Sequence, residues 1–163
     1  MWLWQEVQAL PRCDLRLAET QDQDNLDALI FRSKAHWGYD AEMMAIMKRV
    51  LKVSQDALRD QRVMLGIIDQ DIAGVVQIEQ VDPKRCELDL LFIDPAFMGQ
   101  GVGKALYDWS VNWTRTAGCR ELTILSDPYA QPFYEAMGAD FIEMRPSDAV
   151  PGRELPWLVH TLI

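Results

Sequence analysis

The stretch Asp94-Pro-Ala-Phe-Met-Gly-Gln-Gly-Val-Gly-Lys-Ala-Leu106 decides the fold of this 163-residue chain. In the run over residues 86–93 just before it, Leu88, Leu90 and Phe92 alternate with Glu87 and Asp89, which predicts a mostly buried strand. Pro95 cannot continue this strand because proline has no N–H for a strand ladder. From Gly101 onward apolar residues recur at helical spacing until Gly118, so we expect a helix of about four turns. A strand, a tight turn and a helix start therefore follow one another closely.

The tight turn contains three glycines at alternate positions, Gly99, Gly101 and Gly103. Glycines let a ligand approach the backbone, and the first N–H groups of a helix have no internal partners. Such a turn predicts a site for a phosphate or pyrophosphate, to which Lys104 adds a positive charge. The alternative is a glycine-rich turn that merely leads into a core helix.

Two common phosphate motifs do not fit this turn. A P-loop would need glycine at position 98 and Ser or Thr at 105, whereas the chain has Met98 and Ala105. A dinucleotide fingerprint starting at either of the first two glycines would need glycine at 104, or glycine or alanine at 106. The chain has Lys104 and Leu106 instead.

The strand over residues 86–93 has neighbours before and after it. Apolar runs at 63–68 and 72–78 are joined to each other and to this strand by short polar turns, so all three are antiparallel. The run at 121–125 returns through the helix and is therefore expected to lie parallel to the 86–93 strand. A ligand is then expected at the carboxyl ends of this parallel pair, where the glycine turn also lies.

The remaining pattern completes one α/β (α+β) domain over residues 1–163, with residues 1–12 as an N-terminal extension. Thr20 and Gln23 have the spacing of a helix cap, and Trp2 and Trp4 predict a strap over the core or a dimer contact. The other expected elements are strands over residues 13–20, 141–144 and 158–162, a first helix to about residue 35, a second helix after Asp40, a short helix ending at Gly138, and a loop over residues 145–156.

Composition limits the partners. With 49% hydrophobic and 25% charged residues the chain has the make-up of a globular core, and no run approaches the length of a membrane span. Its net charge of −9 argues against binding nucleic acid or an anionic membrane and is compatible with a cationic substrate. Cys13, Cys86 and Cys119 have no ligand spacing, which predicts free thiols, no metal site and a cytoplasmic location.

The order Met98-Gly-Gln-Gly-Val-Gly103 resembles the coenzyme A pyrophosphate loop of the GNAT superfamily of N-acetyltransferases, although Met98 stands where Arg or Gln is usual. A second stretch, residues 127–138, is similar to the same family through Asp127, Ala130, Phe133, Tyr134 and Gly138, with Asp127 where asparagine is usual. The resemblance covers residues 13–163. Residues 33–39, together with the loop over residues 145–156, are similar to a bacterial subgroup of undefined substrate. It implies a GNAT fold, with a mixed sheet of six to seven strands splayed between the fourth and fifth strands and flanked by about four helices.

The resemblance also implies a co-substrate, acetyl-CoA, and the residues that hold it. The pantetheine would pair with the backbone of Leu91, Phe92 and Ile93. The expected contacts in the two matching stretches are Met98, Gly99, Gln100, Gly101, Val102, Gly103, Lys104, Asp127 and Tyr134. His36, Trp37 and Tyr39 are implied to lie nearest the amine acceptor; alternatively they form an aromatic plug between two helices.

Transfer to an amine needs a base and an acid, because the amine is mostly protonated near neutral pH and the leaving thiolate must regain a proton. Glu87 stands at the family's glutamate position and is our candidate base, acting through water, with Asp89 or His36 as alternatives. Asp89 is expected on the same strand face as Glu87, where two carboxylates raise each other's pKa. An exposed strand face or an ion pair with a nearby cation is the other interpretation of Glu87.

Tyr134 matches the family tyrosine that protonates the sulfur, and otherwise its hydroxyl would only hold the cofactor. The expected function is therefore acetyl transfer to a primary amine of a small molecule or peptide, by direct attack in a ternary complex. The main alternative is a non-catalytic acyl-CoA-binding or regulatory module, and a nucleotide-binding regulatory domain is a third. The acceptor, the acyl preference and the oligomeric state stay open, although the family analogy favours a homodimer.

Overall fold

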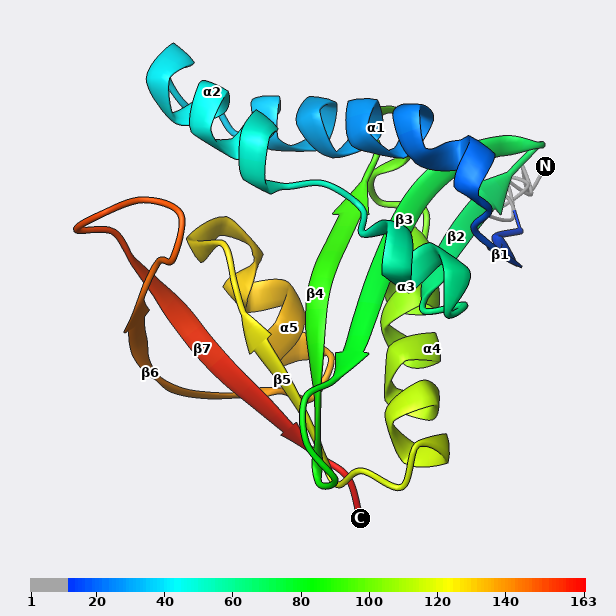
Figure 1. Ribbon diagram of the computed structural model, residues 1–163, viewed down its shortest axis with the longest axis vertical. Coiled ribbons are helices and arrows are strands. Elements are labelled where there is room, and N and C mark those ends of the chain that lie inside the picture. Colours follow the sequence, from blue (N-terminus) through cyan, green and yellow to red (C-terminus); the bar gives the residue numbers. More distant parts are fainter. Residues whose placement is uncertain (1–11) are drawn as a thin grey trace, which may run out of the picture.

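The computed structural model describes residues 12–163 as a single mixed sheet with helices packed against it (Figure 1). The strand order is β1-β2-β3-β4-β5-β7-β6. The strands are β1 (Asp14–Leu17), β2 (Val63–Ile68), β3 (Asp71–Gln80), β4 (Arg85–Ile93), β5 (Glu121–Leu125), β6 (Asp140–Pro146) and β7 (Glu154–Thr161). The helices are α1 (Gln23–Ala35), α2 (Ala41–Val50), α3 (Gln55–Arg59), α4 (Val102–Thr116) and α5 (Gln131–Ala136).

The strands β4 and β5 form the one parallel pair of the sheet within the described residues, and they separate soon after they meet. Only Arg85–Glu87 of β4 pair with residues 121–123 of β5. Beyond that point β5 follows β7, which it pairs with along its whole length, and β4 follows β3. Figure 1 shows the two strands diverging towards α1 and α2. The predicted splay between the fourth and fifth strands is confirmed.

Two hydrophobic clusters cover the two faces of the sheet. One joins α4 and α5 to the sheet through Leu88, Leu106, Tyr107, Leu122 and Tyr134, all nearly inaccessible to solvent. The other packs α1 and α3 on the opposite face and includes Leu26, Ile30, Leu58, Leu65 and Leu90. Burial of these apolar side chains is the main force that holds the helices on the sheet.

The start of α4 is pressed against the sheet at two paired glycines. Gly66 of β2 lies opposite Gly74 of β3, and a Cβ on either would come within 2.7 or 2.8 Å of Val102 Cγ1. A larger residue at either position would push the helix start outward. The missing side chains therefore place the glycine turn directly at the mouth of the diverging strands.

A β-bulge in β4 changes which side chains share a face. Leu90 lies opposite Gln77 and Leu88 opposite Ile78, so Asp89 is an extra residue in β4. Leu88 consequently packs with the α4 cluster, whereas Leu90 and Phe92 belong with the α1 cluster. The regular alternation expected from the sequence, with these three apolar residues on one face, is wrong at this point.

Other boundaries also differ from expectation. The helix α3, which Ser54 caps by accepting from the Ala57 N–H, brings the described helices to five rather than about four. The turn before α1 is capped by Glu19 and Asp22, not by Thr20, because each of those carboxylates binds the other residue's backbone N–H. β6 and β7 take up residues from both sides of the expected loop, which shortens it to residues 147–153.

Several predictions concern parts of the chain that the structure does not decide. Trp2, Trp4 and nearly all of the expected extension over residues 1–12 lie outside the described residues. The single domain over residues 1–163 stays a prediction for the same reason. No helix in the described range is both long enough and apolar enough to cross a membrane.

Candidate active site

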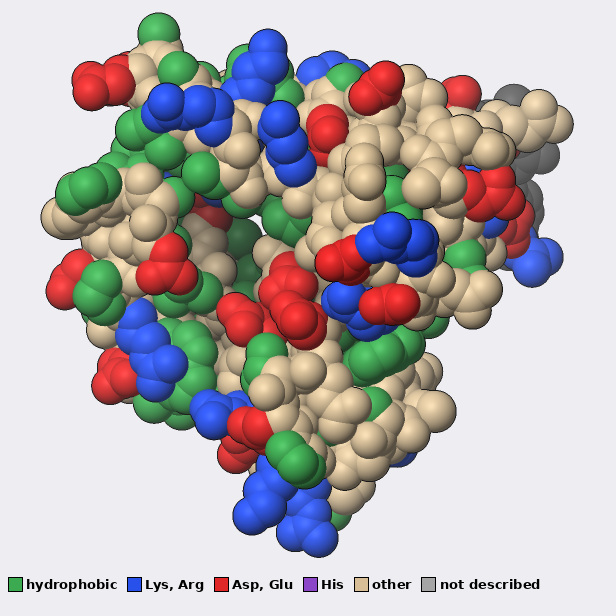
Figure 2. Space-filling model, viewed as in Figure 1, with side chains coloured by type: hydrophobic (Ala, Val, Ile, Leu, Met, Phe, Trp, Pro, Cys, Tyr) green, Lys and Arg blue, Asp and Glu red, His purple; other side chains and the backbone are tan. Residues whose placement is uncertain are grey.

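A cavity of about 580 Å³ occupies the gap where β4 and β5 part. Its walls come from the free ends of both strands, the glycine turn, α1, α2, α5 and the loop between β6 and β7. Figure 2 shows a hollow in the surface here, with acidic side chains gathered beside it. A single cavity thus connects the glycine turn to the centre of the sheet.

The glycine turn is open to a ligand. Gly99 and Gly101 have φ values of +79° and +82°, and a Cβ on either would meet nothing within 4 Å. The first bond of α4 runs from the Ala105 N–H to the Gly101 carbonyl at 3.1 Å, so the N–H groups of residues 102–104 precede the helical ladder. This combination of positive helix end and unhindered backbone fits a phosphate or pyrophosphate.

Three residues of the predicted loop contribute less directly. Gly103 faces the Phe133 ring, which a Cβ would approach to 3.3 Å, so its missing side chain serves packing of α4 on α5. Lys104 lines the cavity, but its Nζ is paired with Asp108 Oδ2 at 2.6 Å. Gln100 is half-buried and does not line the cavity, whereas Met98, Gly99 and Val102 do.

The β4 wall of the cavity includes Asp89 and the predicted backbone stretch 91–93. Burial raises the pKa of Asp89 to about 6, even though Gln77 Nε2 donates to Asp89 Oδ2 at 3.2 Å. The negative charges of Glu87 and Glu79 raise it further. Glu87 is half-buried with a pKa raised by burial, yet it does not line the cavity. Of the two predicted carboxylates, the structure therefore brings only Asp89 to the cavity wall.

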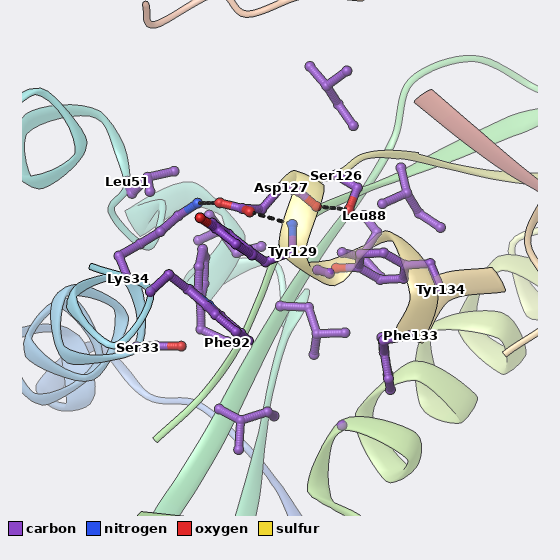
Figure 3. A pocket seen from close by; sticks show the side chains of 18 of the residues that line it. Ser33, Lys34, Leu51, Leu88, Phe92, Ser126, Asp127, Tyr129, Phe133 and Tyr134 are labelled. Atoms are coloured by element: carbon purple, nitrogen blue, oxygen red, sulfur yellow. Dashed lines mark hydrogen bonds and ion pairs between the residues drawn. The ribbon is translucent and has the colours of Figure 1, made fainter. Parts of the chain in front are cut away.

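Tyr134 approaches the cavity from α5 on the opposite side (Figure 3). Its side chain is 5% exposed and packs against the rings of Phe133 and Tyr107, at centroid distances of 5.2 and 6.0 Å. Burial raises the pKa of Tyr134, so the phenol keeps its proton at neutral pH. Within the described residues its hydroxyl makes no side-chain hydrogen bond, and it is available as a donor.

Asp127 begins the turn before α5 and is the centre of a polar cluster. Its Oδ2 accepts from Lys34 Nζ at 2.7 Å, and its Oδ1 accepts from the Tyr129 N–H at 2.9 Å (Figure 3). Oδ2 also accepts from the Tyr39 hydroxyl at 2.5 Å. Although burial alone would raise it, the pKa of Asp127 is held below its usual value by Lys34 and Tyr39. Asp127 lines the cavity, but both of its oxygens are already engaged by the protein.

The aromatic loop after α1 reaches the same place only in part. Trp37 lines the cavity and stacks on Tyr129, with ring centroids 5.1 Å apart and planes 3° apart. Tyr39 stands behind the cavity wall, where its hydroxyl joins the Asp127 cluster. His36 is exposed and contacts Trp37 edge to face at 5.2 Å, without lining the cavity. Of the three residues only Trp37 lines the cavity, and their place beside an acceptor stays a prediction.

Two cations of the cavity wall were not anticipated from the sequence. Lys34 extends from α1, and Arg153 from the β6–β7 loop donates to the Tyr39 hydroxyl at 2.9 Å. Both lie in stretches that resemble the bacterial subgroup, but only the structure shows that they meet at Asp127. Among residues 12–163, no group of three or more His, Cys, Asp or Glu is arranged to hold a metal ion.

The fold and the site together suit a phosphate-bearing ligand between two parted parallel strands. Over residues 19–139 the sequence matches the family model described as "Acetyltransferase (GNAT) family". This match covers more than half of the chain, which therefore belongs to the GNAT acetyltransferase family. A search among curated proteins finds no match.

Solved structures share the fold at low sequence identity. A GCN5-related N-acetyltransferase from Rhodopseudomonas palustris superposes with a TM-score of 0.75 at 15% identity, over 94% of this chain and 98% of the other. The PaiA N-acetyltransferase from Thermoplasma acidophilum, in complex with coenzyme A, gives 0.75 at 13% identity, over 92% and 99%. The N-acetylglutamate synthase from Neisseria gonorrhoeae, complexed with coenzyme A and N-acetyl-glutamate, gives 0.68 at 18% identity, over 93% of this chain and 35% of that one.

These findings confirm the family, the fold class and the predicted co-substrate, acetyl-CoA. The protein is accordingly an acyltransferase by family. The roles of individual residues stay predictions, as do the acceptor and the homodimer.

Proposed function

We propose that this protein is an acetyl-CoA-dependent N-acetyltransferase that acts on a primary amine of a small molecule or peptide. The observation that carries the proposal is the single cavity that runs from the open glycine turn to Asp89 on one side and Tyr134 on the other. A pyrophosphate held at residues 99–104 would direct the pantetheine along residues 91–93 towards these two side chains. A cytoplasmic location accords with this function and stays a prediction.

The proposed reaction is direct attack in a ternary complex. Asp89, directly or through water, takes a proton from the ammonium group, and the free amine nitrogen attacks the thioester carbon. The C–N bond forms, the C–S bond breaks, and Tyr134 gives its proton to the departing thiolate. The attacking nitrogen then loses its second proton, which restores the phenol of Tyr134. A carboxyl with a pKa of about 6 is suited to act as base near neutral pH, and a buried phenol is suited to remain an acid until the thiolate appears.

We propose Asp89 as base in preference to Glu87 because only Asp89 lines the cavity. The nearby charges of Glu79 and Glu87 would still favour the approach of a cationic amine. Holding both substrates in one cavity of limited volume supplies much of the expected acceleration, through orientation and removal of water.

The experiment is a thiol-release assay with a panel of primary amines at fixed acetyl-CoA. We expect free coenzyme A to appear in proportion to acetylated amine for at least one acceptor. A non-catalytic acyl-CoA-binding module would instead bind acetyl-CoA in a titration without releasing thiol above the rate without enzyme. Tighter binding of ATP than of coenzyme A would favour a nucleotide-binding regulatory domain and contradict the proposal.

A further inference from the structure

The cavity carries an excess of positive charge on the wall formed by α1 and the β6–β7 loop. Lys34 Nζ lies 2.7 Å and Arg153 Nη2 lies 3.7 Å from the same oxygen, Asp127 Oδ2. The three side chains are only 9%, 18% and 12% exposed. One carboxylate thus stands against two cations in a place with little water, and one positive charge is left over.

The excess positive charge affects the pKa of Lys34. Burial lowers the pKa of Lys34, the contact with Asp127 opposes this, and the charge of Arg153 lowers the pKa further. The charge of Asp148, an acidic residue of the same loop, raises the pKa of Glu87. Among the described contacts Asp148 forms no ion pair with Arg153. An anion bound between Lys34 and Arg153 would relieve this imbalance.

Arg153 also has hydrogen-bond donors to spare. Within the described residues its side chain donates one hydrogen bond, to the Tyr39 hydroxyl, out of the five that a guanidinium can donate. Its charge lies 5.2 Å from the centre of the Tyr39 ring, so the guanidinium is held in place without being saturated. A held, planar, unsaturated guanidinium is suited to bind a carboxylate through two parallel hydrogen bonds.

The β4 wall of the same cavity presents the opposite charge, the carboxyl group of Asp89. Its neighbours Glu79 and Glu87 add negative potential on that side. The glycine turn that suits the pyrophosphate of the co-substrate is built from residues 98–104, and among the described contacts none of these residues pairs with Lys34 or Arg153. The cavity therefore suits a ligand that carries both a cation and an anion.

We infer that the acceptor is an amine that also carries a carboxylate, an amino acid or a close analogue. Its ammonium group would face Asp89, and its carboxylate would face Arg153 and Lys34. This inference rests on the proposed function and names the class of its acceptor. The part that it adds is a specificity site made of Arg153, oriented by Tyr39, with Lys34 as its cationic neighbour.

The test compares acceptors that differ only in the carboxylate. For a panel of amino acids, thiol release is measured with each acid, with its carboxamide and with the decarboxylated amine. Charge-assisted hydrogen bonds predict a kcat/KM that is roughly 10- to 100-fold higher for at least one acid than for its two neutralised analogues.

Variants test whether Arg153 causes the preference for a carboxylated acceptor. Arg153→Gln is expected to remove most of the ratio between acid and carboxamide, and Arg153→Lys to restore part of it, because lysine keeps the charge without the planar fork. Arg145→Gln is the matched control, since Arg145 lies on β6 outside the cavity, paired with Glu143 at 2.8 Å. It should leave the ratio unchanged.

The outcomes separate the inference from the proposed function. If the carboxamides and decarboxylated amines are acetylated as well as the acids, the enzyme stands and the specificity site is wrong. If Arg153→Gln and Arg145→Gln give the same ratio as wild type, Arg153 does not read a carboxylate. Thiol release is also measured with an acyl-CoA whose acyl group carries a carboxylate. If wild type releases thiol faster from this donor than from acetyl-CoA with any carboxylated amine, the anion belongs to the acyl group and the inference is overturned. If no amine releases thiol, the proposed function itself fails.

Discussion

At the scale of single residues, the environment of Asp89 lowers the stability of the folded protein at neutral pH while it suits the side chain to act as a base. Its pKa rises from 3.8 to about 6 on folding, so between these values the folded state binds more protons than the unfolded state. Stability therefore falls as pH rises from about 4 to 6, and the penalty is fully present above pH 6. A half-buried carboxylate whose charge weakens the fold is typical of residues retained for chemistry.

Asp89→Asn is accordingly expected to raise the stability and lower the activity. The side chain keeps its shape and can still accept from Gln77, while the buried charge disappears. Above pH 6 the variant should be the more stable protein by urea denaturation, with the difference vanishing near pH 4. Turnover should fall by roughly 100-fold or more, and the acidic limb of the pH–rate profile near pH 6 should be lost. An unchanged profile would remove Asp89 from the role of base.

Tyr134→Phe tests the proposed acid. The phenylalanine ring fills the same space against Phe133 and Tyr107, so the effect should lie in the chemistry rather than the packing. We expect turnover to fall by roughly 100-fold while the affinity for acetyl-CoA changes little. Isothermal titration with coenzyme A beside steady-state rates makes the comparison. Equal turnover in both proteins would show that Tyr134 only lines the cavity.

At the scale of elements, the glycine turn and the helix α4 act together as one anion site. Gly101→Glu would add strain at a left-handed residue and a negative charge where the pyrophosphate is expected. Gly118, with a φ of +79° and equally open surroundings at the other end of α4, provides a matched control. We expect Gly101→Glu and the control Gly118→Glu to lose similar stability, about 1–2 kcal/mol, but only Gly101→Glu to lose acetyl-CoA binding. Normal affinity in Gly101→Glu would contradict the anion site.

The hairpin between β2 and β3 gives an independent stability prediction. Its two turn residues, Asp69 and Gln70, both have positive φ, at 49° and 73°. This is a turn of the kind that favours glycine at the second position. Gln70→Gly should therefore stabilise the protein by about 0.5–1 kcal/mol, measured as a higher urea midpoint with unchanged slope. Since neither turn residue lines the cavity, acetyl-CoA affinity should not change.

At the scale of the whole molecule, the parted strands leave unpaired backbone in the middle of a sheet. β4 continues from Leu88 to Ile93 without a partner on the β5 side. A ligand that pairs with this edge would complete the sheet locally, in addition to the stabilisation that any native-state ligand supplies.

Hydrogen exchange with and without coenzyme A can separate these effects. We expect several-fold slower exchange in peptides that cover residues 88–93 and 99–105. The outer strand β6 should change little, because no residue of β6 lines the cavity. Equal slowing in all three segments would indicate global stabilisation alone and would count against pairing along β4.

Much of the architecture follows from local patterns. Residues 86–93 are mostly apolar, Pro95 ends the strand, and the glycines precede a helix, so the strand, turn and helix are found within a residue or two of their expected bounds. The parallel pairing of β4 and β5 follows from their connection through a helix. These features depend on backbone conformation and side-chain periodicity, which neighbouring residues set.

Which side chains line the cavity near Asp89 and Asp127 depended on the tertiary structure. The sequence indicated Glu87 and His36 as well as Asp127 as site residues, and only Asp127 of these three lines the cavity. The bulge at Asp89 and the packing of three loops decide which side chains reach it. Lys34 and Asp127, which meet at 2.7 Å, are 93 positions apart in the chain. The sequence by itself determined the strands, the helix start and the open turn that define the family. Only the folded chain decided which charges face one another, because that depends on strand register and loop packing that no local pattern encodes.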